Sequence, residues 1–180
     1  MKYKLIIFTL FISLITNWGF SQTQTMHDLY FTIPEIAILD IEPNTNDIIL
    51  DFNAPIEAGD QLEELSDNTK WLNYTSTVTK GGLLRNITAQ ITSSIGIPGL
   101  KIELLVSKYT GGGKGVFGTP VGTIDLTTTA QTIITGIGGC YTNTGASSGH
   151  RLEYNASIND YSVFEIHVTP TLDIIFTISN

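Results

Sequence analysis

The sequence predicts an all-β protein, a single antiparallel β-sandwich of the immunoglobulin-like or jelly-roll-like kind that follows a cleaved signal peptide. Three observations predict this fold. Apolar and polar residues alternate along most of the chain after residue 21. Turn-forming residues separate these runs at intervals of roughly 10–15 residues, as in sandwiches and barrels. Threonine, isoleucine and valine, which suit a pleated surface, are the dominant residue types within the runs.

The first 21 residues have the composition of a secretory signal. Lys2 and Lys4 precede the apolar run 5–15, and Gly19-Phe20-Ser21 provides a small-x-small cleavage site. The run is shorter than the ~20 apolar residues that a membrane span needs, so a cleaved signal is favoured over a transmembrane anchor. We therefore expect residues 1–21 to be a signal peptide and residues 22–180 to be one exported domain. The Gly19-Phe20-Ser21/Gln22 junction resembles those of proteins exported into Gram-negative envelopes, which implies a location that is secreted or at the cell surface, after export through the inner membrane.

The charge of the exported part argues against two classes of partner. Removing Lys2 and Lys4 leaves seven basic against 17 acidic residues, a net charge of −10. A protein this acidic is repelled by phosphate backbones and by anionic lipid headgroups. We therefore expect no nucleic-acid partner and no stable membrane insertion after signal cleavage.

Five runs after the signal show the alternation most clearly. Because side chains of a strand alternate between its faces, each run has one face for a core and one for solvent. The apolar faces are, in chain order, Leu72, Tyr74 and Val78; Leu84, Ile87, Ala89 and Ile91; Leu152, Tyr154, Ala156 and Ile158; Phe164, Ile166 and Val168; and Leu172, Ile174, Phe176 and Ile178. About ten strands are expected in all.

Segments rich in Gly, Pro, Asn and Thr separate the runs and are expected to be turns or loops. Glycine accepts a positive φ, and proline fixes φ near the value that turns require. These segments are Pro43–Asp47, Lys80–Gly82, Pro98–Gly99, Thr110–Gly115, Gly118–Gly122, Gly136–Gly139 and Asn143–Gly149. The acidic stretch Pro55–Lys70 is expected to be a short helical turn or a surface loop.

Two short motifs match enzyme patterns without the structural context that their chemistry needs. Gly145–Gly149 matches G-x-S-x-G and His150 follows it, but a strand comes next, where a nucleophile elbow requires a helix. Gly113–Gly118 matches G-x-G-x-x-G, but Pro120 prevents the helix that would hold a pyrophosphate, so a mobile hairpin loop is expected. We expect no catalytic residues and no cofactor. A hydrolase on a jelly-roll scaffold stays open as an alternative, because that fold also carries enzymes.

Metal sites and disulfides are not expected either. The three histidines lack the spacing of zinc ligands, and Glu57–Asp67 lacks the alternating pattern of a calcium loop. Cys140 is the only cysteine, so no internal disulfide can form. A small buried residue is favoured for Cys140 over a reactive thiol or an intermolecular disulfide.

Ligand recognition, if present, is expected in the loops 110–122 and 143–150, because loops on a rigid sandwich commonly carry binding. Tyr141 or Trp71 would stack on a sugar ring, although a buried position between the sheets is favoured for Trp71. His150 is expected at the solvent-exposed mouth of a loop. The candidate recognition residues are Lys114, Phe117, Tyr141, His150 and Trp71.

Taken along its length, the chain resembles bacterial secreted β-sandwich proteins of the fimbrial-subunit and surface-adhesin kind. The features that carry the resemblance are the signal, the early run Leu29–Ile33, the Gly/Thr-rich middle and the terminal run Thr171–Ser179. The resemblance implies assembly by strand addition, in which an extended N-terminal segment completes the sheet of a neighbouring subunit. Leu29, Phe31 and Ile33 would then fill pockets in that neighbour. The favoured alternative makes this run the first strand of a self-complete sandwich.

The expected function is that of an exported, non-catalytic structural or adhesive module of the bacterial cell surface, of the fimbrial-subunit type. The expected partners are further copies of the chain or other surface proteins. An extracellular module that binds carbohydrate or another small ligand is the alternative.

Overall fold

The computed structural model describes residues 24–44, 46–92, 97–165 and 171–180, and the chain divides into two units, Met1–Ile33 and Pro34–Asn180. In the first unit, residues 24–33 form no strand, and all of them are exposed. A first strand over Leu29–Ile33 is therefore not formed. The expected signal peptide, residues 1–21, lies outside the described residues.

The second unit is all-β, as predicted. Its strands are β1 (Ala37–Glu42), β2 (Leu65–Ser76), β3 (Arg85–Ile91), β4 (Leu100–Val106), β5 (Lys114–Pro120), β6 (Thr123–Asp125), β7 (Gln131–Tyr141), β8 (His150–Ile158) and β9 (Ile174–Ser179). Every strand pairing is antiparallel. No helix occurs in the described ranges.

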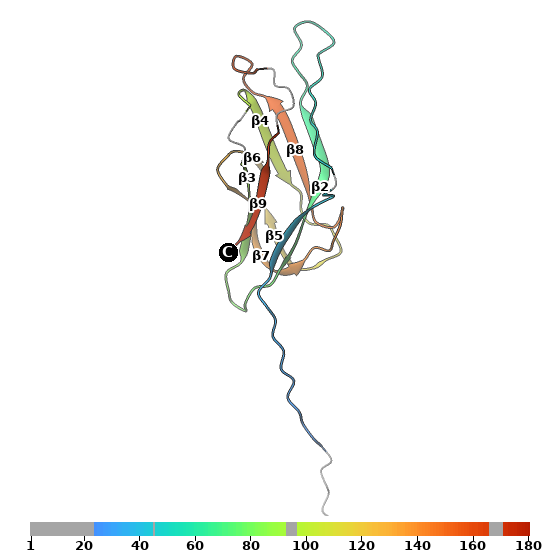
Figure 1. Cartoon of the computed structure of the whole chain (residues 1–180), viewed down its shortest axis with the longest axis vertical. Helices are drawn as coiled ribbons and strands as arrows, with labels where there is room; N and C mark the ends of the chain where they lie inside the picture. The colour runs from blue at the N-terminus through green and yellow to red at the C-terminus, as the bar shows by residue number, and fades with distance from the viewer. Residues whose placement is uncertain (1–23, 45, 93–96, 166–170) are drawn as a thin grey trace, which may run out of the picture. The chain divides into compact units, whose positions relative to one another are not determined.

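The nine strands belong to one hydrogen-bonded sheet (Figure 1). Its order is β6-β4-β8-β2-β7-β3-β9, with β1 paired to β2 and β5 paired to β7. A short pairing of Thr75 with Tyr141 and of Ser76 with Cys140 joins β2 to β7. This junction links the strands β1, β2, β8, β4 and β6 to the strands β5, β7, β3 and β9.

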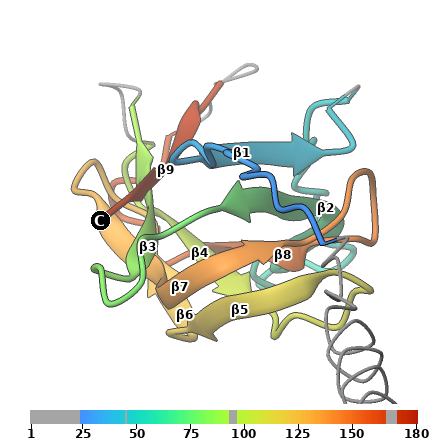
Figure 2. The ribbon, with the colours of Figure 1, turned by 90° about the horizontal axis from the view of Figure 1, so that it is seen from below.

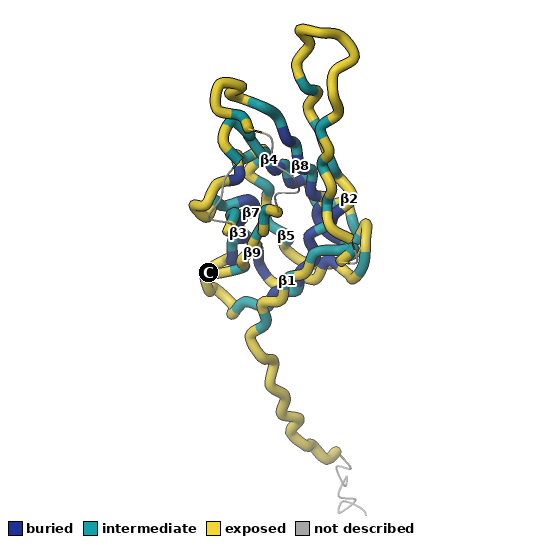
Figure 3. Tube along the Cα trace, turned by 45° about the horizontal axis from the view of Figure 1, so that its top comes forward, coloured by how far each residue is buried: buried dark blue, intermediate teal, exposed yellow. Residues whose placement is uncertain are grey.

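Both groups of strands contribute to a single apolar core, seen as the dark segments of Figure 3. The predicted inward faces are confirmed at Leu72 and Tyr74, at Ile87 and Ala89, and at Leu152, Tyr154 and Ala156, which are all buried. Leu84, which was expected on the second of these faces, precedes β3 and is 52% exposed. Ile133, Ile134 and Ile137 of β7 fill the centre. Cys140 is buried at the edge of this core, as expected for a small structural residue.

Some of the segments that were expected to be turns lie in strands, whereas Lys80–Gly82, Pro98–Gly99 and Asn143–Gly149 lie outside the strands, as expected. Gly136–Gly139 lies inside β7, and the expected loop 113–118 falls largely in β5. Gly115 has a φ of 120°, and an added Cβ would lie 2.2 Å from the carbonyl oxygen of Gly139. These glycines therefore permit a close approach of two strands, which is a different use of glycine from a turn.

Two other expectations on the strands need correction. β2 begins at Leu65, so part of the stretch that was expected to be helical or looped is a strand. Phe164 and Glu165 form no strand, and the rest of that expected run, residues 166–168, lies outside the described residues.

Candidate functional site

The N-terminal segment carries the most exposed apolar side chains of the described chain that share a strand-like spacing. Leu29, Phe31 and Ile33 are 80%, 79% and 71% exposed, and Tyr30 between them is 87% exposed. Large apolar side chains are common singly on protein surfaces, but a contiguous set marks an interaction site. The sequence brings these three residues to one face of any extended conformation, and no strand in the described part of the chain pairs with the segment.

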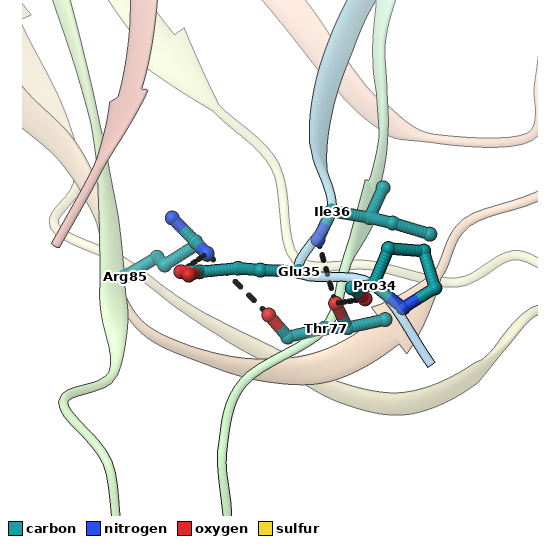
Figure 4. A network of polar contacts seen from close by, with 5 residues as sticks. All are labelled: Pro34, Glu35, Ile36, Thr77 and Arg85. Carbon is teal, nitrogen blue, oxygen red and sulfur yellow. Dashed lines mark hydrogen bonds and ion pairs between the residues drawn. The ribbon is translucent and has the colours of Figure 1, made fainter. Parts of the chain in front are cut away.

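A network of polar contacts fixes the start of the β unit directly after this segment (Figure 4). The backbone N–H of Ile36 donates to Thr77 Oγ1 at 2.6 Å, and that hydroxyl donates to the carbonyl oxygen of Pro34 at 3.0 Å. The buried Arg85 donates to Glu35 Oε1 at 2.5 Å and to the carbonyl oxygen of Thr77 at 3.4 Å. Pro34, Glu35 and Ile36 are thus each tied to the sheet.

Strands β1 and β9 form a rim at which the core is incompletely covered. Leu39 and Ile41 of β1 pack against the core but stay half-buried, as do the core-facing residues Ile174, Phe176 and Ile178 of β9. Among the described residues, β1 pairs only with β2, and β9 pairs only with β3. Figure 2 shows β9 passing close to β1. We call this region the β1/β9 rim.

A buried polar cluster surrounds His150, which was expected at a solvent-exposed loop mouth. His150 is fully buried. Its Nδ1 lies 2.8 Å from the carbonyl oxygen of Ser107, and its Nε2 lies 2.8 Å from the hydroxyl of Tyr74. That hydroxyl donates to the carbonyl oxygen of Phe117 at 2.5 Å. The expectation was wrong because His150 follows the period of β8, in which it shares the inward face with Leu152 and Tyr154.

Burial keeps this cluster neutral. It lowers the pKa of His150 below 6.5, against the opposing effect of the Ser107 and Phe117 carbonyls, and it raises the pKa of Tyr74 far above 10. A neutral imidazole carries one ring hydrogen, so His150 donates either from Nδ1 to the Ser107 carbonyl or from Nε2 to the Tyr74 hydroxyl. The ring contacts of His150 are with Tyr74 and Tyr109. The cluster is therefore suited to holding strands together.

We expect the free energy of unfolding to fall as the pH drops below 6.5, because His150 binds a proton less readily when folded than when unfolded. The unfolded state then takes up more protons, and stability is lost as the pH falls from 6.5 towards the folded pKa. For one proton the slope is at most about 1.4 kcal/mol per pH unit.

Urea unfolding between pH 8 and pH 5 measures this slope. His150→Gln should flatten the slope, whereas His27→Gln, at an exposed position, should keep it. An unchanged slope in His150→Gln would show that other groups cause the loss.

Within the described residues, Ser147 of the G-x-S-x-G segment and His150, which follows it, form no hydrogen bond with each other. Ser147 is exposed with a φ of 65°. Both ring nitrogens of His150 are engaged by Ser107 and Tyr74, so the histidine that follows the motif does not act on Ser147. No group of three or more metal-ligating side chains gathers in the described ranges.

Of the five candidate recognition residues, the structure brings two together on the surface. Lys114 of β5 and Tyr141 of β7 are directly opposed across the sheet, and both are exposed. Phe117 is half-buried against Tyr109, with 3.8 Å between ring centroids, and Trp71 is half-buried in β2. Thr75, which pairs with Tyr141, was missed, because a pairing between residues this far apart in the chain leaves no local signal.

Comparisons of the chain with models of protein families, with curated proteins and with solved structures found no match. The described part of the chain contains no helix of the length and apolar character needed to cross a membrane. A function is therefore inferred from the geometry of the chain itself.

Proposed function

We propose that the chain is an exported, non-catalytic structural or adhesive module of the bacterial cell surface, and that it associates with further copies of itself by strand addition. The single observation that carries this proposal is the exposed, unpaired segment 24–33. Export is supported by the composition of residues 1–21, with its basic start and its apolar run.

The fold that suits this role is a β-sandwich. β1, β2, β8, β4 and β6 would form one layer, and β5, β7, β3 and β9 the other. Two features support this interpretation: the two groups meet through the short β2–β7 junction, and side chains from both groups share one core. In such a fold the open edges of the outer strands are the places where another chain can add.

Strand addition uses two physical contributions. Main-chain hydrogen bonds between the added segment and an open edge supply affinity, and alternate side chains fill pockets. The segment meets both requirements, because its backbone is unpaired in the described residues and Leu29, Phe31 and Ile33 share one face. The β1/β9 rim is the acceptor that best fits, since its core-facing side chains are half-buried and an added strand would cover them.

The expected affinity is modest. Burying Leu29, Phe31 and Ile33 contributes about 5–9 kcal/mol before costs, at about 1.5–3 kcal/mol per side chain. Association of two proteins costs roughly 4–15 kcal/mol in lost freedom of motion and in ordering. The apolar contacts alone therefore do not suffice, and the main-chain hydrogen bonds of the added strand decide whether the complex forms.

Phe31→Asp is expected to weaken self-association of the chain lacking residues 1–21 by about 10- to 100-fold, the factor that corresponds to losing about 1.5–3 kcal/mol of apolar burial. Tyr30→Asp is the matched control, because Tyr30 lies in the same segment on the opposite face. It introduces the same charge and should weaken association much less.

Sedimentation equilibrium over a range of concentrations measures both variants against the unmodified chain. A chain that stays monomeric at the highest concentration would refute the proposal. Equal effects of the two substitutions would show that charge and not the face of the segment matters, and would refute the strand geometry.

A further inference from the structure

A row of four exposed or half-buried side chains crosses the sheet at the junction of its two groups of strands. Ile38 of β1 pairs with Thr75 of β2, Thr75 pairs with Tyr141 of β7, and Tyr141 pairs with Lys114 of β5. Directly opposed residues in a sheet point to the same face, about 5 Å apart. The row therefore places an aliphatic group, a hydroxyl, a phenol ring and an ammonium group side by side on one surface.

The neighbouring positions leave a hollow beside this row. Gly139 comes two residues before Tyr141 on the same face and has no side chain, and Thr77 lies two residues beyond Thr75. These residues, with Thr75, Lys114 and Tyr141, line an open hollow of about 370 Å³. The volume of the hollow and the exposed ring of Tyr141 suit one sugar unit or a short segment of an oligosaccharide.

The polar groups of the row are not engaged by the protein. Within the described residues, the hydroxyls of Thr75 and Tyr141 and the ammonium group of Lys114 form no side-chain hydrogen bond or ion pair. The Thr77 hydroxyl differs, because it is held by Pro34 and Ile36. Thr75, Tyr141 and Lys114 are thus free to bind a ligand without first breaking a contact.

The charge of the hollow differs from that of the whole protein. The chain carries 17 acidic against nine basic residues, yet Lys114 is the one charged residue among those that line the hollow. A lysine in a lining without a carboxylate attracts an anionic group. A ring of a sugar can lie against the face of Tyr141, while a hydroxyl bonds to Thr75.

We propose that this hollow is a binding site for an acidic saccharide, with Tyr141 stacking on the sugar ring, Lys114 pairing with its carboxylate and Thr75 bonding to a ring hydroxyl. The site goes beyond strand addition and does not depend on it. It would let a surface module attach to polysaccharides that carry uronic acids.

Titration with trigalacturonate, followed by isothermal calorimetry and by NMR shifts of the Tyr141 and Gly139 amides, tests the site. Tyr141→Ala is expected to weaken binding by about tenfold, since a stacked ring contributes about 0.5–1.5 kcal/mol beyond its buried area. Lys114→Gln is expected to weaken binding about threefold at low salt, as for an exposed ion pair. The methyl ester of the same trisaccharide should bind both the unmodified chain and Lys114→Gln with equal, reduced affinity.

Two control variants keep the result specific. Tyr30→Ala removes an exposed tyrosine from the N-terminal segment, and Lys80→Gln removes an exposed lysine of a turn. Neither should change the affinity. Absence of trigalacturonate binding would overturn the proposal, and so would equal binding of a glutamate-rich peptide, which would assign the hollow to acidic protein segments.

Discussion

Gly115→Ala is expected to lower the free energy of unfolding by about 3–5 kcal/mol. The φ of Gly115 is 120°, a conformation that costs an alanine about 1–3 kcal/mol. The new Cβ would also lie 2.2 Å from the carbonyl oxygen of Gly139 and 2.5 Å from the Cα of Cys140. Both are backbone atoms that no rotamer change can move, so the β5–β7 pairing must open locally. Forcing extra volume into a packed site adds about 1–3 kcal/mol.

Gly122→Ala separates the steric contribution from the conformational one. Gly122 has a similar φ of 102°, but no atom lies within 4 Å of the position its Cβ would take. Gly122→Ala should therefore lower the free energy of unfolding only by the cost of the backbone conformation, about 1–3 kcal/mol. Denaturant unfolding measures both variants. Equal losses for Gly115→Ala and Gly122→Ala would contradict the close approach of β5 and β7.

Amide hydrogen exchange adds a local measurement to the global one. In Gly115→Ala, protection should fall first at β5 and at the paired end of β7, which includes Cys140 and Tyr141. Protection across the pairing of β3 with β9 should stay closer to that of the unmodified chain. A uniform loss of protection would mean that the substitution acts on the whole sheet.

The fold class could be predicted from the sequence because period two is a local property. The alternation of Leu72 with Asn73 and of Leu152 with Glu153 reveals a strand without knowledge of its partner. The structural role of a glycine cannot be predicted from its local sequence in this way. Gly115 and Gly139 read as turn residues until the chain is seen to bring β5 against β7, because the same residue type serves turns and close approaches.

The candidate sites were likewise predictable only where they depend on local sequence and not on the pairing of distant strands. The spacing of Leu29, Phe31 and Ile33 is that of a strand. This spacing predicts that the segment can form a strand, but it does not predict whether a partner strand is present. Lys114 was predicted as a recognition residue in a loop and Tyr141 as a separate stacking residue, but their adjacency, and that of Thr75, comes from pairings between distant strands. His150 is the opposite case: the period of β8 already placed it inward, and only its polarity suggested solvent.

Tyr74→Phe is expected to lower the free energy of unfolding by about 1–3 kcal/mol, although it removes a single oxygen atom. The Tyr74 hydroxyl donates its one hydrogen to the carbonyl oxygen of Phe117 and lies 2.8 Å from Nε2 of His150. Without it, the Phe117 carbonyl loses this hydrogen bond, and an unsatisfied buried group costs about 1–3 kcal/mol. The affected contacts hold β2, β5 and β8 together, so the loss falls on three strands at once.

Tyr154→Phe is the matched control for this prediction. Tyr154 is also a buried tyrosine whose ring packs in the core, but its hydroxyl makes no hydrogen bond within the described residues. Its substitution should change stability by less than about 1 kcal/mol. If Tyr74→Phe and Tyr154→Phe had equal effects, the hydroxyl would contribute nothing, and ring packing alone would join the three strands around His150.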